Sequence, residues 1–295
     1  LKPRQRRLLT SMTRNITGTT RLAAVIGDPV RHSMSPQIHN AAFAACDIDG
    51  VYVALPVAHG DAGQAVAAMR AFDWFGLSVT MPHKQSVMAA CDELTPTAEM
   101  LGAVNCVFWH DGKIVGDSTD GQGYVRGLKA ELDLDVAGLQ CALVGAGGAA
   151  GAVARSLADH GAASVTVINR TAEKAELVAA LAGEVGRPGS MDELANADLV
   201  INATPIGMGS TDFVDAVPFD VAALRNDAIV SDLIYHPAET RLLAEARTRG
   251  LRTQNGLAML VHQAVVQFEH WTGVAAPVDA MTSAITSSLA SRTES

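Results

Sequence analysis

A rhythm in the second half of the chain constrains the fold more than any other feature of the sequence. Short runs rich in Val, Ile and Leu alternate there with segments of helical length, and the runs lie in QCALVGAGG, SVTVINRT, ADLVINAT and AIVSDLIY. Strands that are buried on both faces have such continuous apolar runs, and helices between them form right-handed crossovers. We therefore predict an α/β architecture with a parallel sheet in this half.

The first half of the chain also mixes strands and helices. RLAAVIG, VYVALPV and GLSVTMP predict strands, and SPQIHNAAF has helical spacing with Ser35 as a candidate N-cap. The dipeptide Asp111-Gly112 between two further apolar runs predicts a β-hairpin. With 295 residues, of which 48% are hydrophobic, the chain is long enough for two domains that each bury a core.

The stretch CALVGAGGAAG carries a cofactor motif. Gly145, Gly147 and Ala150 match the pattern G-x-G-x-x-[GA] directly after a predicted strand and at the start of a predicted helix. The first glycine permits a tight turn, the second lets the backbone approach a pyrophosphate, and the alanine allows helix and strand to pack closely. A glycine-rich turn without a ligand is the alternative, and it explains the flanking strand and helix less well.

The end of the following strand decides between the two nicotinamide cofactors. Enzymes that use NAD usually have an acidic residue at this place, which binds the ribose 2′-hydroxyl. This strand ends instead in Asn169, Arg170 and Thr171, with Lys174 one turn later. Because arginine can pair with a phosphate or stack on adenine, the pattern favours NADP. The alternative is that Asn169 and Thr171 only cap the next helix and that Arg170 is solvated.

Several polar residues outside this motif are candidates for a substrate site. GDPVRHSMSP places Ser33 and Ser35 two residues apart, and in an extended segment both would point the same way and could bind a carboxylate or a diol. Thr80 and Lys84 flank a proline turn in VTMPHK, and Asn105 stands in an otherwise apolar strand. Turn or cap formation by the serines and a solvated lysine are the simpler alternatives.

Two further candidates complete this set. Asp120 lies with Asp117 in the turn-like segment GDSTDG, and Gln263 lies on an apolar helix in LVHQA. Turn formation is the ordinary role of such aspartates. Together the candidates supply hydroxyls, amides, a lysine and a carboxylate, which suits the oxidation of one carbinol in a polyhydroxylated ring acid.

Charge and cysteine patterns exclude other classes of protein. A net charge of −9 argues against a nucleic-acid partner, because phosphate binding favours a basic surface. The four cysteines have no zinc-ligand spacing, so we expect no metal site. No apolar run reaches the roughly 18 residues of a membrane span, so we expect a cytoplasmic protein. Residues 1–21 are basic and contain no acid, which predicts a disordered leader.

Taken in order, the motifs reveal a family resemblance. GDPVRHSMSPQIHNAAF, VTMPHK, LGAVN, GDSTDG, GAGGAA with NRTAEK, INATPIGM and NGLAMLVHQA are similar to signature segments of the shikimate dehydrogenase family, over about residues 22–285. The resemblance implies a two-domain α/β fold. Residues 22–120 and 256–295 would form the substrate domain, and residues 121–255 would form a Rossmann domain that binds NADP.

The resemblance also implies a reaction, the NADP-dependent reversible reduction of 3-dehydroshikimate to shikimate on the route to chorismate and the aromatic amino acids. Lys84 and Asp120 would form the catalytic pair, with Lys84 exchanging a proton with the reacting oxygen. The implied substrate contacts are Ser33 and Ser35 for the carboxylate, Tyr235 near it, and Thr80, Asn105 and Gln263 for ring hydroxyls. The implied cofactor contacts are Gly145, Gly147, Gly148 and Ala149 at the pyrophosphate, Asn169, Arg170, Thr171 and Lys174 at the 2′-phosphate, and Gly256.

Three positions depart from the family pattern. Met34 stands where Lys is frequent, Ser78 where Asn precedes V-T-x-P, and Ser118 where the family has G-D-N-T-D. A quinate/shikimate dehydrogenase or an aminoshikimate dehydrogenase therefore stays open as an alternative. A non-catalytic nucleotide-binding paralogue is the alternative from another class, and the presence of both Lys84 and Asp120 argues against it. A folate-type dehydrogenase of similar layout does not explain SMSP and GDSTDG together, and the sequence leaves a monomer or a homodimer open.

Overall fold

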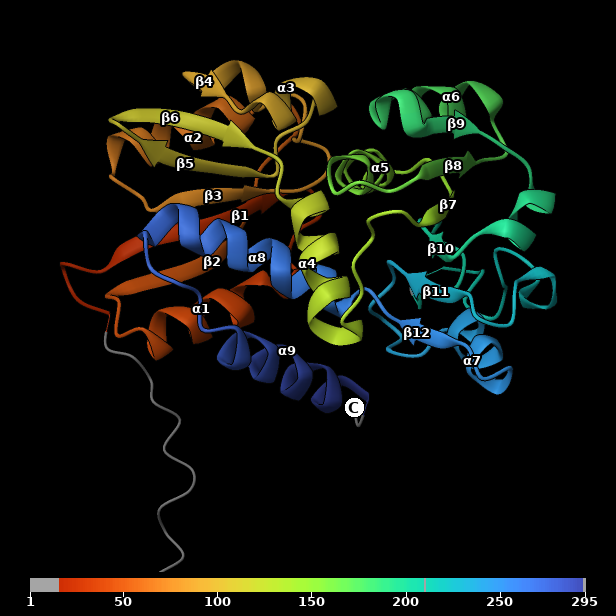
Figure 1. The fold of residues 1–295 in the computed structure, drawn as a ribbon. Coiled ribbons are helices and arrows are strands. Elements are labelled where there is room, and N and C mark those ends of the chain that lie inside the picture. The colour runs from red at the N-terminus through yellow and green to blue at the C-terminus, as the bar shows by residue number, and fades with distance from the viewer. Residues whose placement is uncertain (1–15, 210, 294–295) are drawn as a thin grey trace, which may run out of the picture.

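The computed structural model describes residues 16–209 and 211–293. They form an α/β fold with two six-stranded sheets, and helix α4 (Asp120–Leu132) lies between the sheets (Figure 1). The leader predicted for residues 1–21 lies mostly outside the described residues. Its last residue, Arg21, already belongs to the first strand.

The first sheet is mixed and has the strand order β2-β1-β3-β5-β6-β4. Strands β1, β2 and β3 are parallel, whereas β5 runs antiparallel to both of its neighbours. The predicted hairpin is confirmed, since Asp111 and Gly112 both have positive φ angles, 48° and 76°, as a type I′ turn requires. The strands are β1 (Arg21–Gly27), β2 (Gly50–Pro56), β3 (Gly76–Val79), β4 (Glu93–Leu94), β5 (Cys106–His110) and β6 (Lys113–Asp117), and the helices are α1 (Ser35–Ala45), α2 (Ala62–Ala71), η1 (Met88–Ala90) and α3 (Pro96–Leu101).

The second sheet is parallel throughout, which confirms the prediction for this half. Its strand order is β12-β11-β10-β7-β8-β9, so the chain leaves β7 in one direction and later returns to its other side. Open α/β sheets bind ligands at the carboxyl ends of their strands, beside such a switch point. The strands are β7 (Gln140–Val144), β8 (Ser164–Ile168), β9 (Gly186–Pro188), β10 (Leu199–Asn202), β11 (Ile229–Asp232) and β12 (Arg252–Gln254), and the helices are α5 (Ala150–Asp159), α6 (Ala172–Leu181), η2 (Gly183–Val185), η3 (Met191–Asn196), η4 (Val221–Ala223) and α7 (Arg241–Thr248).

Glycines allow α4 to pack closely against α8 (Leu257–Thr272). A Cβ at Gly123 would lie 2.4 Å from the backbone nitrogen of Gln263, and a Cβ at Gly127 would lie 2.9 Å from the Cβ of Ala258. No larger residue fits at Gly123 without moving one of the two helices. This close packing fixes α8 relative to the start of α4, where Asp120 is located.

The C-terminal helices return to the first half of the molecule. Helices α8 and α9 (Val278–Thr293) pack on α1, and Phe268 and Met281 join Ile38 and Phe43 in the core of the first sheet. The second sheet has separate cores on its two faces. The domain boundaries at residues 120 and 256 stay a prediction, since α4 contacts α5 of one half and α8 of the other.

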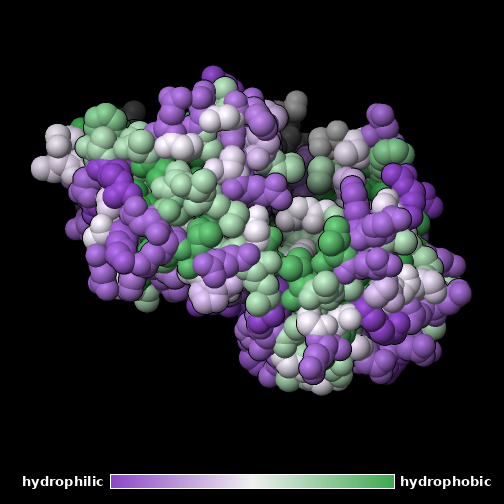
Figure 2. Space-filling view, turned by 90° about the horizontal axis from the view of Figure 1, so that it is seen from above, coloured by the Kyte–Doolittle hydropathy of each residue, from purple (hydrophilic) through white to green (hydrophobic). Residues whose placement is uncertain are grey.

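The surface reflects this division. Figure 2 shows two lobes, with apolar side chains gathered where the lobes meet and polar ones over most of the remaining visible surface. In the part of the chain that the structure describes, no helix is both long and apolar enough to cross a bilayer.

Candidate active site

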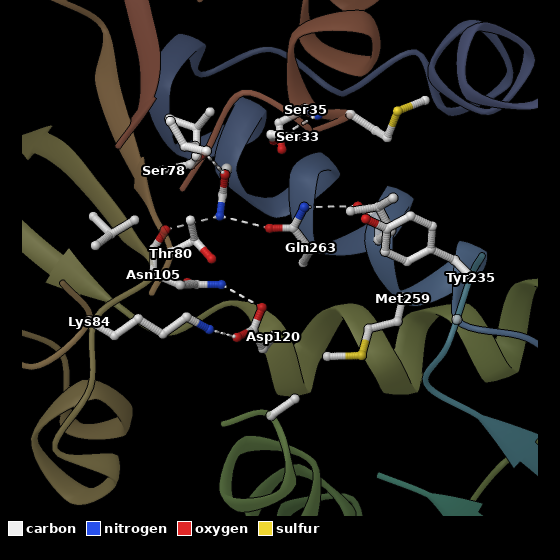
Figure 3. Close-up of a pocket in the computed structure, with 18 of the residues that line it drawn as sticks. Ser33, Ser35, Ser78, Thr80, Lys84, Asn105, Asp120, Tyr235, Met259 and Gln263 are labelled. Carbon is white, nitrogen blue, oxygen red and sulfur yellow. Dashed lines mark hydrogen bonds and ion pairs between the residues drawn. The ribbon is translucent and has the colours of Figure 1, made fainter. Parts of the chain in front are cut away.

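A cavity of about 280 Å³ lies between the two halves, beside the carboxyl ends of β1, β3 and β11 (Figure 3). Its lining includes every residue predicted to contact the substrate or to act in catalysis, together with two of the predicted cofactor residues. These are Ser33, Ser35, Thr80, Lys84, Asn105, Asp120, Tyr235 and Gln263, with Ala149 and Gly256. Residues as far apart in the sequence as Ser33 and Gln263 therefore meet at one site.

The lysine and the aspartate form an ion pair at this site. Lys84 Nζ lies 2.6 Å from Asp120 Oδ2, and both side chains are largely buried, with 24% and 14% of their surfaces exposed. Lys84 follows the turn that ends β3, and its backbone oxygen accepts a hydrogen bond from the N–H of Val104 at 2.8 Å. Asp120 is the first residue of α4. The simpler alternative of a solvated surface lysine therefore does not apply.

Asn105 contacts Asp120 from the other side. Its Nδ2 donates to Asp120 Oδ1 at 2.7 Å, and its Oδ1 accepts from the backbone N–H of Thr119 at 2.7 Å. A buried amide needs partners for both of its ends, and here both are satisfied. Asp120 therefore accepts one hydrogen bond at each carboxylate oxygen, which fixes the plane of the carboxylate and the place of the Lys84 ammonium group.

The two serines lie in a turn, which is the simpler of the two alternatives considered above. The segment before α1 is a turn rather than an extended strand, since the N–H of Ser33 donates to the backbone oxygen of Val30 at 2.9 Å. Ser35 is the first helical residue, and Met34 occupies the N-cap position predicted for it. Ser33 Oγ accepts from the N–H of Ser35 at 3.3 Å, as in a serine turn. Both serines still line the cavity because the turn brings them there.

The glycine-rich turn has the features that a dinucleotide requires. Gly145 has φ of 111°, and a Cβ there would lie 2.8 Å from the backbone of Ala203, so only glycine fits. Gly147 and Gly148 are exposed, with no backbone or side chain within 3.3 Å of the place where a Cβ would stand. Helix α5 begins directly after them, at Ala150, with its free N–H groups. This turn fits the pyrophosphate of a dinucleotide.

The glycine-rich turn also lies close to the Lys84–Asp120 ion pair. Gly147 and Gly148 line a second cavity of about 350 Å³, whose wall includes Lys84 and Asp120. The remaining predicted cofactor residues lie further out, between the end of β8 and the first turn of α6. Asn169 Nδ2 donates to the backbone oxygen of Thr171 at 2.9 Å, and this contact does not cap α6, because a cap accepts from the free N–H groups of a helix.

The charged residues of this segment are available to a ligand. The side chain of Thr171 makes no cap hydrogen bond to α6, and Arg170 and Lys174 are exposed. Two cations without a neighbouring carboxylate contact would suit a phosphate group. In the described residues, no ion pair joins Arg170 or Lys174 to an acidic side chain.

A buried carboxylate supports the loops at the end of the second sheet. Asp232 accepts hydrogen bonds from Asn202 Nδ2 at 3.0 Å, from the N–H of Ile234 at 3.0 Å and from Thr240 Oγ1 at 2.8 Å. Burial raises the pKa of Asp232 to about 6, and the three hydrogen bonds reduce the shift. These hydrogen bonds fix the segment that follows β11, and this segment places Tyr235 in the cavity wall. Asp232 was not among the predicted site residues.

A polar side chain that the sequence did not single out, that of Gln267, also lines the cavity. Gln267 lies four residues after Gln263 on α8, is fully buried, and lines the cavity beside Ser78. The spacing of four residues on one helix face was the signal that could have found it. In the described part of the chain, no group of three His, Cys, Asp or Glu side chains could hold a metal ion.

Three family models match consecutive parts of the chain. The shikimate dehydrogenase substrate binding domain matches residues 25–107, the shikimate / quinate 5-dehydrogenase model matches residues 128–208, and the shikimate 5′-dehydrogenase C-terminal domain matches residues 256–286. The chain is 43% identical over 284 residues to the shikimate dehydrogenase (NADP(+)) of Symbiobacterium thermophilum, an alignment that covers 92% of this chain and 96% of that protein.

Solved structures give the same likeness. A shikimate dehydrogenase crystallised with NADP+ has a TM-score of 0.86 and 38% identity, over 93% of this chain and 98% of that one. The shikimate 5-dehydrogenase of Listeria monocytogenes, in complex with shikimate and NAD, has a TM-score of 0.86 and 36% identity, over 93% of this chain and 99% of that one. The likeness therefore covers both sheets and the cavity between them.

Proposed function

The chain belongs to the shikimate dehydrogenase family, and from that premise we propose that it catalyses the NADP-dependent reversible reduction of 3-dehydroshikimate to shikimate. The observation that carries the proposal is the Lys84–Asp120 pair, with 2.6 Å between Nζ and Oδ2, in a cavity lined by hydroxyl and amide side chains next to the glycine-rich turn. Reduction of a ring ketone needs a hydride donor on one side and a proton donor at the oxygen. The pair supplies the proton donor.

In this proposal, Lys84 gives a proton to the carbonyl oxygen as it becomes a hydroxyl, and removes it in the reverse direction. Asp120 and, through it, Asn105 hold the ammonium group in place by the hydrogen bonds described above. Proton transfer at the right geometry contributes roughly 10²- to 10⁴-fold to a rate. NADPH, when bound, supplies the hydride. The chain's residues have to bind the substrate, orient it and deliver the proton.

The remaining polar residues would hold the substrate. Ser33 and Ser35 supply hydroxyl and backbone donors for the ring carboxylate, with Tyr235 beside Gln263 in the same cavity (Figure 3). Thr80 and Gln263 face the ring hydroxyls. Asn105 has one amide hydrogen left for the substrate, because its oxygen and its other hydrogen already have partners.

For the cofactor, we propose that Gly145, Gly147, Gly148 and Ala149 hold the pyrophosphate, and that Gly256 lets the backbone approach the nicotinamide end. A Cβ at Gly256 would lie 2.1 Å from the backbone oxygen of Leu233, so the close packing of these two segments at the cavity requires glycine. Arg170 and Lys174, with Asn169 and Thr171, would surround the 2′-phosphate. The division into residues 22–120 with 256–295 for the substrate and 121–255 for NADP follows from this assignment.

The test is a comparison of substrates and cofactors. Reduced nicotinamide formation is measured with shikimate and with quinate, each with NADP and with NAD, beside a Lys84→Ala variant. Activity with shikimate and NADP that is lost in the variant is expected. Activity mainly with quinate or NAD would favour the quinate/shikimate alternative, to which the altered Ser78 and Ser118 positions point. A cytoplasmic location and a monomeric or homodimeric state remain predictions.

A further inference from the structure

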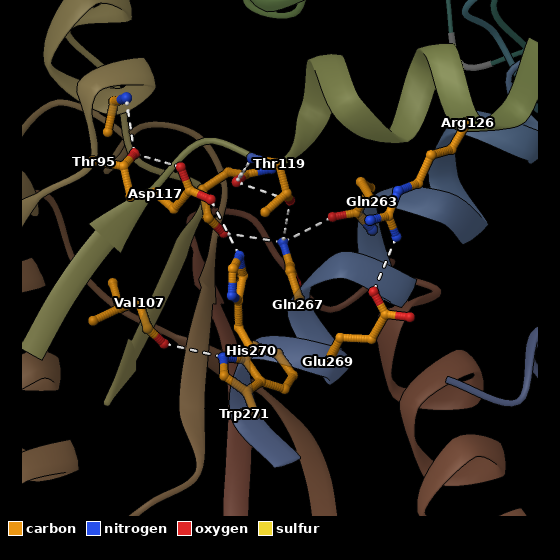
Figure 4. A network of polar contacts seen from close by, with 12 residues as sticks. Thr95, Val107, Asp117, Thr119, Arg126, Gln263, Gln267, Glu269, His270 and Trp271 are labelled. Atoms are coloured by element: carbon orange, nitrogen blue, oxygen red, sulfur yellow. Dashed lines mark hydrogen bonds and ion pairs between the residues drawn. The ribbon is translucent and has the colours of Figure 1, made fainter. Parts of the chain in front are cut away.

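A buried hydrogen-bond network connects the substrate-binding part of the cavity with the catalytic pair. Its centre is the side chain of Gln267, which is 0% exposed (Figure 4). Gln267 Nε2 lies 2.8 Å from Gln263 Oε1, 3.2 Å from Thr119 Oγ1 and 3.3 Å from the backbone oxygen of Asn105. Its Oε1 accepts from Ser78 Oγ at 2.5 Å. A single amide therefore contacts residues from α8, β3 and the segment between β6 and α4.

The orientation of this amide follows from a backbone group of fixed polarity. A carbonyl oxygen can only accept a hydrogen bond, so the end of Gln267 that faces the backbone oxygen of Asn105 is the amino group. The opposite end is then the oxygen, which accepts from Ser78. Ser78 in turn accepts from the hydroxyl of Tyr52 at 2.6 Å, so the chain of donors begins at a buried tyrosine.

The amide of Gln263 is fixed in the same way. Its Nε2 donates to the backbone oxygen of Leu260 at 2.8 Å, and its Oε1 faces the amino group of Gln267. The second hydrogen on Nε2 has no acceptor among the residues that the structure describes. Because Gln263 lines the cavity, this hydrogen is the one that it can offer to a substrate oxygen. Gln263 thus acts as a hydrogen-bond donor toward the cavity. The hydrogen bond from Gln267 to Gln263 Oε1 holds the Gln263 amide in this orientation.

A second branch leads from Gln267 to the catalytic pair. Gln267 donates to Thr119 Oγ1, and Thr119 donates to Asn105 Oδ1 from its hydroxyl at 3.1 Å and from its backbone N–H at 2.7 Å. A backbone N–H can only donate, which fixes the oxygen of Asn105 on this side and its amino group on the side of Asp120. The branch therefore ends at Asp120 Oδ1, opposite the oxygen that holds Lys84.

We propose that Gln267 is a positioning residue that serves both functions of the site, holding Gln263 as a hydrogen-bond donor to the substrate and, through Thr119 and Asn105, fixing the Asp120–Lys84 pair. The inference rests on the proposed function, since it assigns these roles for the oxidation and reduction of one ring alcohol. Loss of Gln267 should weaken substrate binding through one branch and slow catalysis through the other. It should leave cofactor binding unchanged.

The first experiment compares Gln267→Met with Gln254→Met. Gln254 is a matched control, because it is also buried and donates from Nε2 to the backbone oxygen of Gly127 at 2.9 Å but does not line the cavity. Both variants should unfold at a lower temperature. Only Gln267→Met should raise the shikimate KM, by roughly three- to tenfold for one lost hydrogen bond, and lower kcat, by roughly tenfold for a misplaced pair. Its KM for NADP should stay unchanged. Identical kinetics in the two variants would overturn the proposal.

A double-mutant cycle tests whether Gln267 acts through Gln263. In a Gln263→Leu background, Gln267→Met should have no further effect on the shikimate KM but should still lower kcat. KM effects that multiply independently would show that the two glutamines act separately, and would overturn this branch.

The other branch has its own pair of variants, which also serves if Gln267→Met does not fold. Thr119→Val removes the hydroxyl at nearly constant volume and should lower kcat with little change in KM, whereas Thr119→Ser should restore kcat. Equal activity of the two Thr119 variants would overturn the branch. Shikimate oxidation by the unmodified protein distinguishes failure of the proposed function from failure of this inference. If the unmodified protein does not oxidise shikimate, the proposed function is overturned. If it does and the variants are unaffected, only the inference about Gln267 is overturned.

Discussion

At the scale of single residues, the proposed mechanism depends most on the ammonium group of Lys84. Lys84→Ala should lower kcat by roughly 10²- to 10⁴-fold, because it removes the group that exchanges the proton with the reacting oxygen. The KM values should change much less. Lys113→Ala is the matched control, since Lys113 also forms an ion pair, with Glu93, but at the surface. Steady-state kinetics with shikimate and NADP measure both, and a Lys84→Ala variant of near-normal kcat would remove Lys84 from the mechanism.

Arg170 carries the prediction for the cofactor. In the proposed cofactor site its exposed guanidinium binds the 2′-phosphate, so Arg170→Ala should raise the KM for NADP by roughly 10- to 100-fold, as the loss of a charge-assisted hydrogen bond does. The KM for NAD should change little, because NAD lacks that phosphate. Arg155→Ala, on α5 and paired with Asp159, is the control. Equal weakening of both cofactors would indicate instead that Arg170 stacks on adenine.

At this scale, the sequence predicted the residues that line the cavity better than the residues that hold them in place. Lys84, Asp120 and Gln263 lie in recognisable motifs, and the structure brings them to one cavity. The contact between Gln267 and Thr119 joins residues 148 positions apart, although Gln267 and Gln263 are neighbours on one helix face. No local pattern reports such a contact, because it is created by the packing of α8 on the first sheet.

At the scale of elements, period and turn chemistry predicted the strands and the hairpin, since apolar runs and an Asp-Gly pair act locally. For the segment from Val30 to Ser35 the sequence left two alternatives open, an extended segment and a turn, and the structure shows the turn. Alternation of two serines fits a strand, but the hydrogen bond from Ser33 to Val30 closes a turn before α1. The close packing of α4 on α8 was also not predicted. In the sequence alone, glycines within a helix indicate only a low helix propensity, and their role in packing depends on which helix lies against them.

That packing gives a prediction for a single methyl group. Gly123→Ala would place a Cβ 2.4 Å from the backbone nitrogen of Gln263, so α4 and α8 would have to move apart. We expect a loss of roughly 1–3 kcal/mol in the free energy of unfolding, together with a higher KM for shikimate because Gln263 is displaced. Gly63→Ala is the control.

Gly63 is also helical, but its nearest neighbour would be 3.9 Å from the new Cβ, at Ala90. That variant should gain roughly 0.4–1 kcal/mol, since alanine reduces the freedom of the unfolded chain. Urea unfolding of the three proteins measures the difference. A Gly123→Ala variant as stable and active as the unmodified protein would mean that the helices adjust without cost.

At the scale of the whole molecule, two buried carboxylates should give the two halves opposite responses to acid. Asp232, in the second sheet, has a pKa that burial raises to about 6. Burial also acts to raise the pKa of Asp117, in the first sheet, but His270 at 3.3 Å and hydrogen bonds from Thr95 and the backbone of Ser118 outweigh it and lower the pKa. In the unfolded chain, both carboxyl groups have the ordinary pKa of an aspartate, near 3.9.

The direction of each effect follows from which state binds more protons. Between about pH 4 and pH 6 the folded state holds a proton on Asp232 that the unfolded state has released, so this residue's contribution to stability falls as the pH rises through 6. Asp117 behaves in the opposite way: its contribution is complete above the ordinary pKa and is lost as the pH falls below about 4. Asp232 thus stabilises the folded state most at low pH, whereas Asp117 stabilises it most at neutral pH.

Substitution by asparagine separates the two contributions. Asp232→Asn keeps the shape of the side chain and removes the charge, so its free energy of unfolding relative to the unmodified protein should rise by roughly 1–3 kcal/mol between pH 4.5 and pH 7. Asp117→Asn should be less stable than the unmodified protein at pH 7, and the difference should shrink below pH 4. Urea unfolding followed by tryptophan fluorescence and by circular dichroism at each pH measures both. Parallel pH profiles for the two variants would show that these carboxylates do not govern the acid response, because their burial and hydrogen bonding predict profiles of opposite slope.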